Sequence, residues 1–319
     1  MTPEAPVFSV VVCSLNGERV LPACLRCLRV CSAAGKQAEV IVVDNGSTDA
    51  TPRLVAADFP WVRLIRTGRN LGFAGGNNVG IRACQGRLIV LLNDDTQVPA
   101  QWLEKLRVPF ERDPKIGVVG CKLLFPGGRI IQHAGGDVYP NGNTMHRGYG
   151  QPDRGQWDEG GERTYVTGAA VAFRRQMLVR VGLLDPGFFP IYFEETELQV
   201  RAARAGWRIW YEPAAWLIHH ESQSQGAASA RFVYRYTRNR IRFLAMHGFP
   251  EGKVAALRWE MRGARDILAG GRLGALLRGY VAGLVHWPAW RLDRRRRRSL
   301  PMWDGRPVEA EAAVRAEAG

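Results

Sequence analysis

Residues 40–51, which read V-I-V-V-D-N-G-S-T-D-A-T, decide the fold. A short apolar run is followed at once by a polar turn and then by a segment with helical character. Similar transitions recur through the first 120 residues. They predict strands at Val7–Cys13, Val40–Val43, Val62–Ile65, Leu88–Leu92 and Gly117–Gly120, and helices at Glu18–Ala33, Thr51–Asp58, Asn77–Ala83 and Pro99–Arg112. Near-continuous apolar strands that alternate with helices indicate an α/β fold with a mostly parallel central sheet, flanked by helices on both faces.

Polar residues follow four of these predicted strands directly. In such a sheet the ligand lies beyond the carboxyl ends of the strands. We therefore expect one binding edge to be formed by Ser14–Asn16, Asp44–Asp49, Arg66–Asn70 and Asn93–Thr96. Further along the chain, the pattern predicts a strand at Thr164–Phe173, a helix at Glu195–Ala205, and short strands at Trp207–Tyr211 and Trp216–His219.

The formal net charge of +14 is concentrated in the C-terminal third. From Gly226 onward there are 19 Lys and Arg against 8 Asp and Glu, whereas the first 225 residues carry 25 against 22. The charge pattern separates a first domain at 1–225 from a basic helical region at 226–307, and we expect a disordered tail at 308–319.

The sequence also predicts a cytoplasmic protein. No basic segment precedes the first apolar run, and no apolar stretch approaches the roughly 20 residues that span a bilayer. The six cysteines lie within apolar segments and lack a fourth partner at zinc-binding spacing, so we expect reduced, buried thiols.

The first acidic cluster is the Asp94-Asp95 pair at the end of a predicted apolar strand. Mg²⁺ and Mn²⁺ prefer oxygen ligands and often bridge one or two carboxylates to substrate phosphates. Asp94 and Asp95 fit that role. The simpler alternative is that Asp95 or Thr96 caps the helix expected from Pro99.

The second acidic cluster, at residues 192–197, reads Y-F-E-E-T-E. Its carboxylates suit the first turn of a helix, whose dipole favours acids. A more specific interpretation makes one of them a general base that removes a proton from a hydroxyl. His219 and His220 end the last predicted strand, and a neutral imidazole is a ligand for ions such as Mn²⁺.

Seven sequence blocks, taken in order, resemble the family 2 glycosyltransferases. The match extends from about Val7 to Ser222 and looks closest to the rhamnosyltransferase-like branch of cell-wall and polysaccharide assembly enzymes. The blocks are V-V-C-S-L-N (11–16), V-V-D-N-G-S-T-D (42–49), N-L-G-F-A-G-G-N-N (70–78), L-L-N-D-D-T (91–96), V-T-G-A-A-V-A-F-R-R (166–175), Y-F-E-E-T-E-L (192–198) and H-H-E-S (219–222).

The resemblance implies a GT-A fold and an inverting, metal-dependent sugar transfer from a nucleotide-diphosphate sugar, such as a dTDP- or UDP-sugar, to a glycan or lipid-linked acceptor. It implies that Asp94, Asp95 and His219 hold Mg²⁺ or Mn²⁺, and that Asp95 is the principal carboxylate ligand. It places the donor against Ser14, Asn16, Asp44, Asn70, Gly75, Asn77 and Asp94, where Asp44 binds the nucleobase and the Gly75-Gly76 pair allows close backbone approach.

The base position departs from the family pattern. The family commonly has an Asp after a Glu, whereas this chain has Glu194-Glu195. Glu195 aligns with the expected base, Glu197 is an alternative candidate, and Glu194 is a third. Both residue types are carboxylates of similar pKa, but the longer arm changes the geometry.

The basic C-terminal region combines a helical stripe, tryptophans and a run of five arginines. The stripe consists of Leu273, Leu276, Leu277, Tyr280, Leu284 and Val285, followed by Trp287, Trp290 and then Arg294–Arg298. Such a combination indicates attachment to an anionic membrane surface, which places the protein at the inner face of the cell membrane. The alternative is that the stripe packs on the catalytic domain. No motif supports binding to nucleic acid.

Two other functions compete with sugar transfer. A GT-A fold can bind a sugar nucleotide or glycan without turnover, and the Glu194-Glu195 departure favours that alternative. A sugar nucleotidyltransferase would call for a glycine-rich, basic triphosphate loop after the first strand. Residues 14–19, S-L-N-G-E-R, match such a loop poorly.

Overall fold

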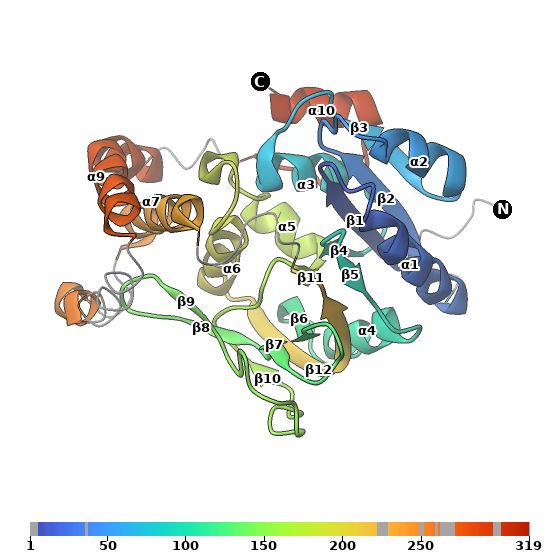
Figure 1. The fold of residues 1–319 in the computed structure, drawn as a ribbon, viewed down its shortest axis with the longest axis horizontal. Coiled ribbons are helices and arrows are strands. Elements are labelled where there is room, and N and C mark those ends of the chain that lie inside the picture. Colours follow the sequence, from blue (N-terminus) through green and yellow to red (C-terminus); the bar gives the residue numbers. More distant parts are fainter. Residues whose placement is uncertain are drawn as a thin grey trace.

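A single mixed sheet forms the centre of the computed structural model (Figure 1). The model describes residues 6–35, 38–221, 229–248, 252–258, 261, 272–295 and 301–318. The strand order is β10-β12-β6-β11-β4-β1-β2-β3, with β5 paired to β12 and β7 paired to β6. The strands are β1 (Phe8–Ser14), β2 (Ala38–Asp44), β3 (Arg63–Arg66), β4 (Leu88–Leu92), β5 (Thr96–Gln97), β6 (Ile116–Leu124), β7 (Ile131–His133), β10 (Gly161–Glu162), β11 (Ala170–Arg174) and β12 (Arg208–His219). A separate hairpin pairs β8 (Gly136–Val138) with β9 (Thr144–His146).

Parallel pairing dominates the sheet, as the sequence predicts. β1 pairs in parallel with β2 and β4, β2 with β3, and β6 with β12. Only β11, β5, β7 and β10 run antiparallel to their neighbours among the described strands of this sheet. Because β1, β2 and β4 point the same way, their polar carboxyl ends meet at one edge.

Two apolar layers cover the sheet. On one face, α1 (Leu21–Gly35), α2 (Thr51–Asp58) and α4 (Trp102–Arg112) pack against alternate strand residues such as Val10 and Val42. The other face, which includes Val11 and Val43, is covered by α3 (Gly72–Ala83), α5 (Arg175–Val181), α6 (Glu194–Arg204) and α10 (Ala310–Ala318). This burial on both faces explains the near-continuous apolar strands. The α/β prediction is confirmed.

Several predicted boundaries differ from the structure. The strand predicted at Thr164–Phe173 begins only at Ala170, and the helix predicted from Asn77 begins at Gly72. The two strands predicted at 207–219 form the single strand β12, which has an irregularity between Glu212 and Trp216. Pro213 lies within that interval and lacks the N–H that a regular ladder needs.

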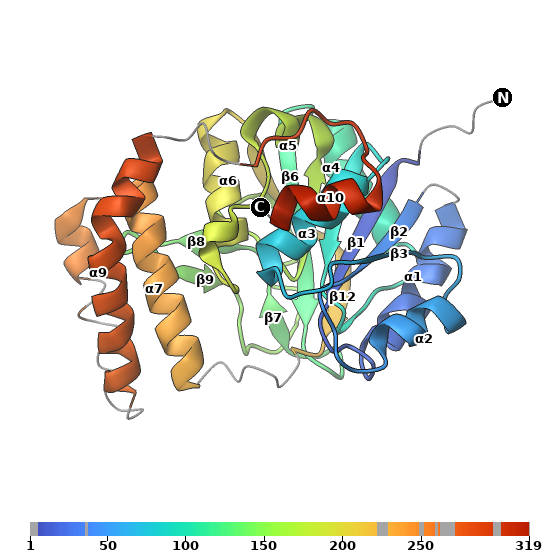
Figure 2. The ribbon, with the colours of Figure 1, turned by 90° about the horizontal axis from the view of Figure 1, so that it is seen from above.

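The described part of the predicted tail, residues 308–318, is largely helical, contrary to the prediction of a disordered segment at 308–319. Residues 310–318 form α10, which lies beside α3 (Figure 2). Ala313 is fully buried there, and Glu317 contacts Arg82 at 2.9 Å and Asn78 at 3.1 Å. Ala, Glu and Arg are strong helix formers, so the composition A-E-A-A-V-R-A-E-A was the missed signal.

A helical pair, α7 (Ala230–His247) and α9 (Leu273–Arg295), lies at one end of the molecule (Figures 1 and 2). Gly279 and Gly283 allow the close approach, because a Cβ at either position would lie within 2.8 Å of side-chain atoms of Thr237 or Ile241. The predicted single stripe is therefore split. Leu276 is buried and Tyr280 partly buried against α7, whereas Leu273, Leu277, Leu284 and Val285 are exposed.

The arginine run 294–298 lies outside the residues whose side chains are described. Within the described part of the chain, no helix combines the length and the hydrophobicity needed to cross a membrane. All six cysteines are free thiols, and four of them are buried. This agrees with the expectation of reduced cysteines.

Candidate functional site

The carboxyl ends of β1 and β2 form the first part of the predicted edge. Ser14 and Asp44 end these two strands in register and are both buried. Asp44 Oδ1 accepts a hydrogen bond from the Ser47 backbone N–H at 3.0 Å, which folds the D-N-G-S turn back on its own carboxylate. Asn16 has a positive φ of 57° and its Oδ1 accepts from the Thr48 backbone N–H at 2.9 Å. Side chains of the two loops thus hold each other in place.

The glycine-rich block at 70–78 forms the first two turns of α3 and the loop before it. Asn70 lies in the loop before α3, where its Oδ1 accepts from the Gly72 N–H at 2.8 Å. Asn77 is buried within α3 and donates to the Phe73 carbonyl at 2.9 Å. Gly76 packs against Cys13, because a Cβ there would lie 2.4 Å from Cys13 Sγ, and a Cβ on Gly75 would lie 2.8 Å from Leu71 Cβ. The structure thus gives Gly75, Gly76 and Asn77 contacts within the helix and against the sheet, so they shape α3.

The Asp94-Asp95 pair follows β4 and meets the end of β1. Ser14 Oγ donates to Asp94 Oδ2 at 2.5 Å. Burial raises the pKa of Asp94 to about 6, and the nearby Asp95 charge adds to that rise, whereas the Ser14 hydrogen bond lowers it. A buried carboxylate with a raised pKa gains free energy when a cation approaches. Asp95 Oδ1 lies 3.1 Å from His219 Nε2, so β4 and β12 contribute to the same place.

His219 is oriented by a residue that the sequence reasoning missed. Its Nδ1 donates to Gln132 Oε1 at 2.6 Å, and Gln132 Nε2 donates to Glu221 Oε2 at 3.1 Å. A proton held on Nδ1 leaves the Nε2 lone pair directed at Asp95 and Asn93, the tautomer that binds metals. Gln132 comes from the short strand β7, and its sequence surroundings carry no signal for this role.

The donor set fits a hard divalent cation that arrives with a diphosphate. Asp94, Asp95 and His219 supply two carboxylates and one imidazole. The described residues contain no group of three such side chains already arranged as a complete metal centre. Magnesium sites commonly use only one or two carboxylates and complete their coordination with substrate phosphates. The arrangement therefore matches a site that forms when the donor binds.

Glu195 occupies the first turn of α6 and faces the end of β11. Tyr165 donates its O–H to Glu195 Oε1 at 3.2 Å. A Cβ on Gly168 would lie 3.1 Å from Glu195 Cγ, so this glycine of the V-T-G-A-A block makes room for the glutamate arm. Burial raises the pKa of Glu195 above its ordinary value, although hydrogen bonds from Tyr165 and backbone N–H groups oppose that rise. A carboxylate with a raised pKa is a better proton acceptor near neutral pH.

Glu194, the residue before Glu195, is also buried. Among the described residues its Oε2 has no hydrogen-bond partner, and burial, together with the Glu195 charge, raises its pKa well above the ordinary value. Two adjacent carboxyl groups do not both ionise easily, because their negative charges repel. The group whose ionised form is better stabilised therefore loses its proton first. The hydrogen bonds to Glu195 make it that group.

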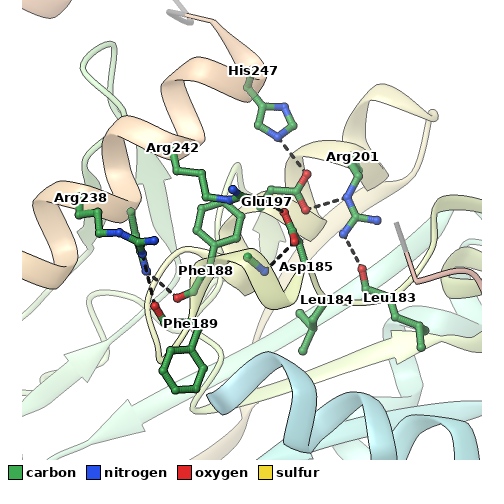
Figure 3. A network of polar contacts seen from close by, with 12 residues as sticks. Leu183, Leu184, Asp185, Phe188, Phe189, Glu197, Arg201, Arg238, Arg242 and His247 are labelled. Carbon is green, nitrogen blue, oxygen red and sulfur yellow. Dashed lines mark hydrogen bonds and ion pairs between the residues drawn. The ribbon is translucent and has the colours of Figure 1, made fainter. Parts of the chain in front are cut away.

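Glu197, the alternative base candidate, points into a network of hydrogen bonds and ion pairs with Arg201 and His247 (Figure 3). It pairs with Arg201 at 2.7 Å and with His247 of α7 at 3.0 Å, and its side chain is fully buried. Arg201 and the hydrogen bond to His247 outweigh the burial and lower the Glu197 pKa to about 2. A carboxylate held so firmly in its ionised form has little capacity to accept a proton, so the prediction for Glu197 is not supported.

α7 fixes the loop that precedes Glu195. Asn239 Nδ2 donates to the carbonyls of Phe188 at 2.7 Å, Ile191 at 3.0 Å and Tyr192 at 3.1 Å. Tyr192 and Phe193 both have positive φ, at 88° and 77°, an arrangement that costs roughly 1–3 kcal/mol per residue and persists only where the surroundings enforce it. Arg242 also pairs with Asp185 at 2.9 Å (Figure 3). The structure therefore joins α7 to the unit that carries the site, although the charge pattern assigns α7 to the C-terminal region.

One cavity of about 370 Å³ contains Glu194 and Glu195 of the second acidic cluster together with His219, the neighbour of Asp95. Its lining also includes Asn93, which follows β4. Aromatic side chains form much of the remaining wall: Phe73, Tyr149, Tyr165, Tyr192, Phe232 and Tyr236. A second cavity, of about 870 Å³ near Lys122 and Trp216, contains none of the predicted site residues.

The family model described as Glycosyl transferase family 2 matches residues 9–182. The chain belongs to this family. The match spans more than half of the chain and includes the ends of β1, β2 and β4 and the Asp94-Asp95 pair. The predicted family is confirmed, and the chain is a glycosyltransferase that uses a sugar-nucleotide donor.

Relatives with assigned names agree with the rhamnosyltransferase-like branch. The chain is 28% identical over 263 residues to the N-acetylglucosaminyl-diphospho-decaprenol L-rhamnosyltransferase of Mycobacterium tuberculosis, a match that covers 73% of this chain and 82% of that protein. It is 33% identical over 200 residues to the O-antigen biosynthesis protein RfbC of Myxococcus xanthus, which covers 59% of this chain but 15% of that protein. The chain is also 30% identical to a protein of Sinorhizobium fredii. That match covers 69% of this chain but 25% of that protein.

A solved structure supports the GT-A fold of this glycosyltransferase. The mannosyltransferase of Pyrobaculum calidifontis, solved in complex with GDP-Man and Mn²⁺, superposes with a TM-score of 0.54 at 18% identity. The superposition covers 99% of this chain and 87% of that one. At this identity the likeness concerns the fold, and it includes the C-terminal helices.

Proposed function

We propose that this glycosyltransferase moves a sugar, with inversion, from a dTDP- or UDP-sugar to a hydroxyl of a glycan or lipid-linked acceptor. One observation carries the proposal. Glu195, the candidate base, and His219, which neighbours Asp95, line the same cavity. Names of relatives add support for rhamnose as the sugar and for a lipid-linked acceptor.

The donor binds along the ends of β1, β2 and β4. Asp44, held in place by the turn at Ser47, binds the nucleobase, and Ser14 and Asn16 line the nucleotide. Asp94, Asp95 and His219 hold Mg²⁺ or Mn²⁺. When bound, the ion neutralises negative charge that develops on the departing diphosphate.

The acceptor lies in the aromatic cavity beside Glu195. The acceptor hydroxyl gives its proton to Glu195 as its oxygen attacks the anomeric carbon. The bond between that carbon and the diphosphate breaks, and its electron pair leaves with the diphosphate. A single displacement from the opposite face inverts the anomeric configuration. Tyr165 positions the base through its hydrogen bond to Glu195 Oε1.

The proposal includes a cytoplasmic site of action at the inner face of the membrane. Exposed apolar residues on α9 and the basic charge of the C-terminal region support contact with an anionic surface. Flotation with anionic and neutral vesicles checks this part. Binding that does not depend on anionic lipid would contradict it.

The central test measures nucleoside diphosphate release by the purified full chain with Mg²⁺ or Mn²⁺ and a panel of nucleotide sugars, with and without lipid-linked acceptor extract. We expect metal-dependent release that is lost in Glu195→Gln and Asp95→Asn and retained in Glu104→Gln, an exposed control on α4. Donor binding without release under all conditions would favour a non-catalytic binding module. Retention of configuration in the product, determined by NMR, would rule out the single displacement.

A further inference from the structure

An apolar groove of about 580 Å³ lies at the helical end of the molecule. Its walls come from α7, the helical segment 253–258 and α9. Aliphatic and aromatic residues dominate the lining, among them Ile241, Leu244, Leu257, Leu284 and Trp287. Two cationic side chains, Arg240 and Lys253, also belong to it. We call this the α7–α9 groove.

The groove and the cavity beside Glu195 are both lined by residues on one face of α7. Phe232 and Tyr236 line the cavity, whereas Arg240 and Leu244 line the groove. These four residues are spaced by four positions, so they share one face of the helix. At about 1.5 Å per residue, Tyr236 and Leu244 are separated by roughly 12 Å along the helix axis.

The β8–β9 hairpin connects the same two sites from the other side. Asn141 lines the groove and its carbonyl accepts from Arg240 Nη1 at 3.2 Å. Thr144 lines the cavity and its N–H donates to Tyr236 O–H oxygen at 3.1 Å. Two separate elements thus run from the cavity wall to the groove wall.

The groove opens on a surface that is unusually apolar and basic. Leu257 and Leu284, which line it, are 60% and 62% exposed, and Val254 and Val285 beside them are 67% and 69% exposed. Lys253, Arg258 and Arg278 are exposed in the same helical segments. The apolar lining of the α7–α9 groove suits a hydrocarbon chain, and its cationic side chains suit a phosphate group attached to that chain.

We propose that the α7–α9 groove binds the hydrocarbon chain of a diphosphate-linked lipid acceptor and thereby directs its sugar into the cavity beside Glu195. This inference rests on the proposed function, because it assigns the acceptor class of the same site. The chain contributes affinity that the sugar alone does not supply. Each buried methylene is worth about 0.8 kcal/mol, or roughly fourfold in binding.

Direct binding tests the groove without requiring turnover. Isothermal titration of the full chain compares farnesyl diphosphate, which carries a chain and a diphosphate, with inorganic diphosphate. We expect farnesyl diphosphate to bind at least about 100-fold more tightly. Leu284→Gln and Leu257→Gln should each weaken its binding about tenfold, because both residues line the groove.

Matched controls separate the groove from a general apolar surface. Val285→Gln and Val254→Gln change residues of similar exposure that do not line the groove, and farnesyl diphosphate binding should stay within about twofold. All four positions are exposed, so the substitutions leave the fold intact. Equal losses in the groove and control variants would overturn the proposal in favour of simple surface insertion. Self-association that Leu284→Gln abolishes would assign the face to a second copy instead.

A parallel assay keeps the two proposals distinguishable. Metal-dependent donor hydrolysis without acceptor should be unchanged in Leu284→Gln and Leu257→Gln, because neither residue lies near Asp95 or Glu195. Normal hydrolysis with no preference for farnesyl over inorganic diphosphate overturns the groove alone. Tight farnesyl diphosphate binding with no sugar transfer supports the groove and contradicts the proposed function.

Discussion

The proposed donor edge, formed by Ser14, Asn16, Asp44 and Asp94, and the proposed acceptor cavity beside Glu195 are built in different ways. At the proposed donor edge, Ser14 and Asp44 end parallel strands and Asp94 follows another by two residues, and Asp44 is held by its own turn at Ser47. At the acceptor cavity, Glu195 depends on Tyr165, and the loop before it depends on Asn239 of α7. The first arrangement follows from the strand pattern, whereas the second requires the whole fold to be in place.

This difference predicts how each half should tolerate change. Substitutions at the donor edge should act on metal and nucleotide binding and leave the remainder of the protein unaltered. Substitutions around α6 and α7 should affect catalysis or stability, because that part carries strained backbone and buried charge. The experiments below test this distinction, beginning with the largest expected effect.

Glu195→Gln should lower kcat by about 10²–10⁴-fold, because an amide does not accept the acceptor proton. Donor binding should change less than twofold, since Glu195 lies on the acceptor side of the cavity. In the wild type, the rate should fall as the pH drops through the Glu195 pKa, which burial raises above 4.5. Steady-state rates from pH 5 to 9 and equilibrium donor titration check these expectations. A large loss of donor affinity in this variant would break the separation of the two halves.

Glu197→Gln should lower the free energy of unfolding by roughly 3–5 kcal/mol, because it leaves Arg201 buried without its charged partner. The Glu197 pKa is lowered to about 2, so its stabilising effect is complete above about 4.5 and is lost as the pH falls toward 2. The difference between wild type and variant should therefore shrink below pH 4.5. Urea unfolding at several pH values measures it.

The control for this experiment is a pair with the same spacing on the surface. Arg107 and Glu111 also lie four residues apart on a helix, at 3.3 Å, but Glu111 is about half exposed. Glu111→Gln should cost no more than about 0.5 kcal/mol. Equal losses of unfolding free energy in Glu197→Gln and Glu111→Gln would show that burial does not determine how much the Glu197 contacts stabilise the protein.

Sequence patterns identified the parts of the site that depend on local structure. The strands that present Ser14, Asp44 and Asp94 were predicted to within a few residues, because buried parallel strands have a distinctive apolar pattern. The pairing of Asp95 with His219 followed from the family resemblance and from the position of His219 at a strand end.

The remaining residues depend on contacts between distant segments. Gln132 occupies a three-residue strand that the sequence pattern does not reveal, and it meets His219 only because β7 and β12 flank β6. The sequence leaves Glu197 as an alternative to Glu195, yet helical geometry turns it toward Arg201 and His247. The sequence predicts a disordered tail at 308–319, but alanines of this segment pack on α3.

Gln132→Leu should raise the metal concentration that gives half-maximal rate by about 10–100-fold. The substitution removes the acceptor that keeps the His219 proton on Nδ1. At saturating metal, kcat should recover most of its wild-type value, which a general loss of fold would not allow. Gln132→Glu retains an acceptor oxygen and should behave more like the wild type, and Gln156→Leu on an exposed loop serves as the unaffected control.

Glu317→Ala should destabilise the protein by about 1–2 kcal/mol, the smallest of these effects, because it removes the shared partner of Arg82 and Asn78. Glu317→Gln keeps an oxygen in place and should cost less than half as much. Burial raises the pKa of Glu317, so its ionised form gains little from this site and the neutral amide is a close substitute. Thermal unfolding compares the two variants, and donor hydrolysis should be unchanged in both. If either variant loses donor binding, α10 must support the donor edge through α3, and the donor half would then depend on distant contacts just as the acceptor half does.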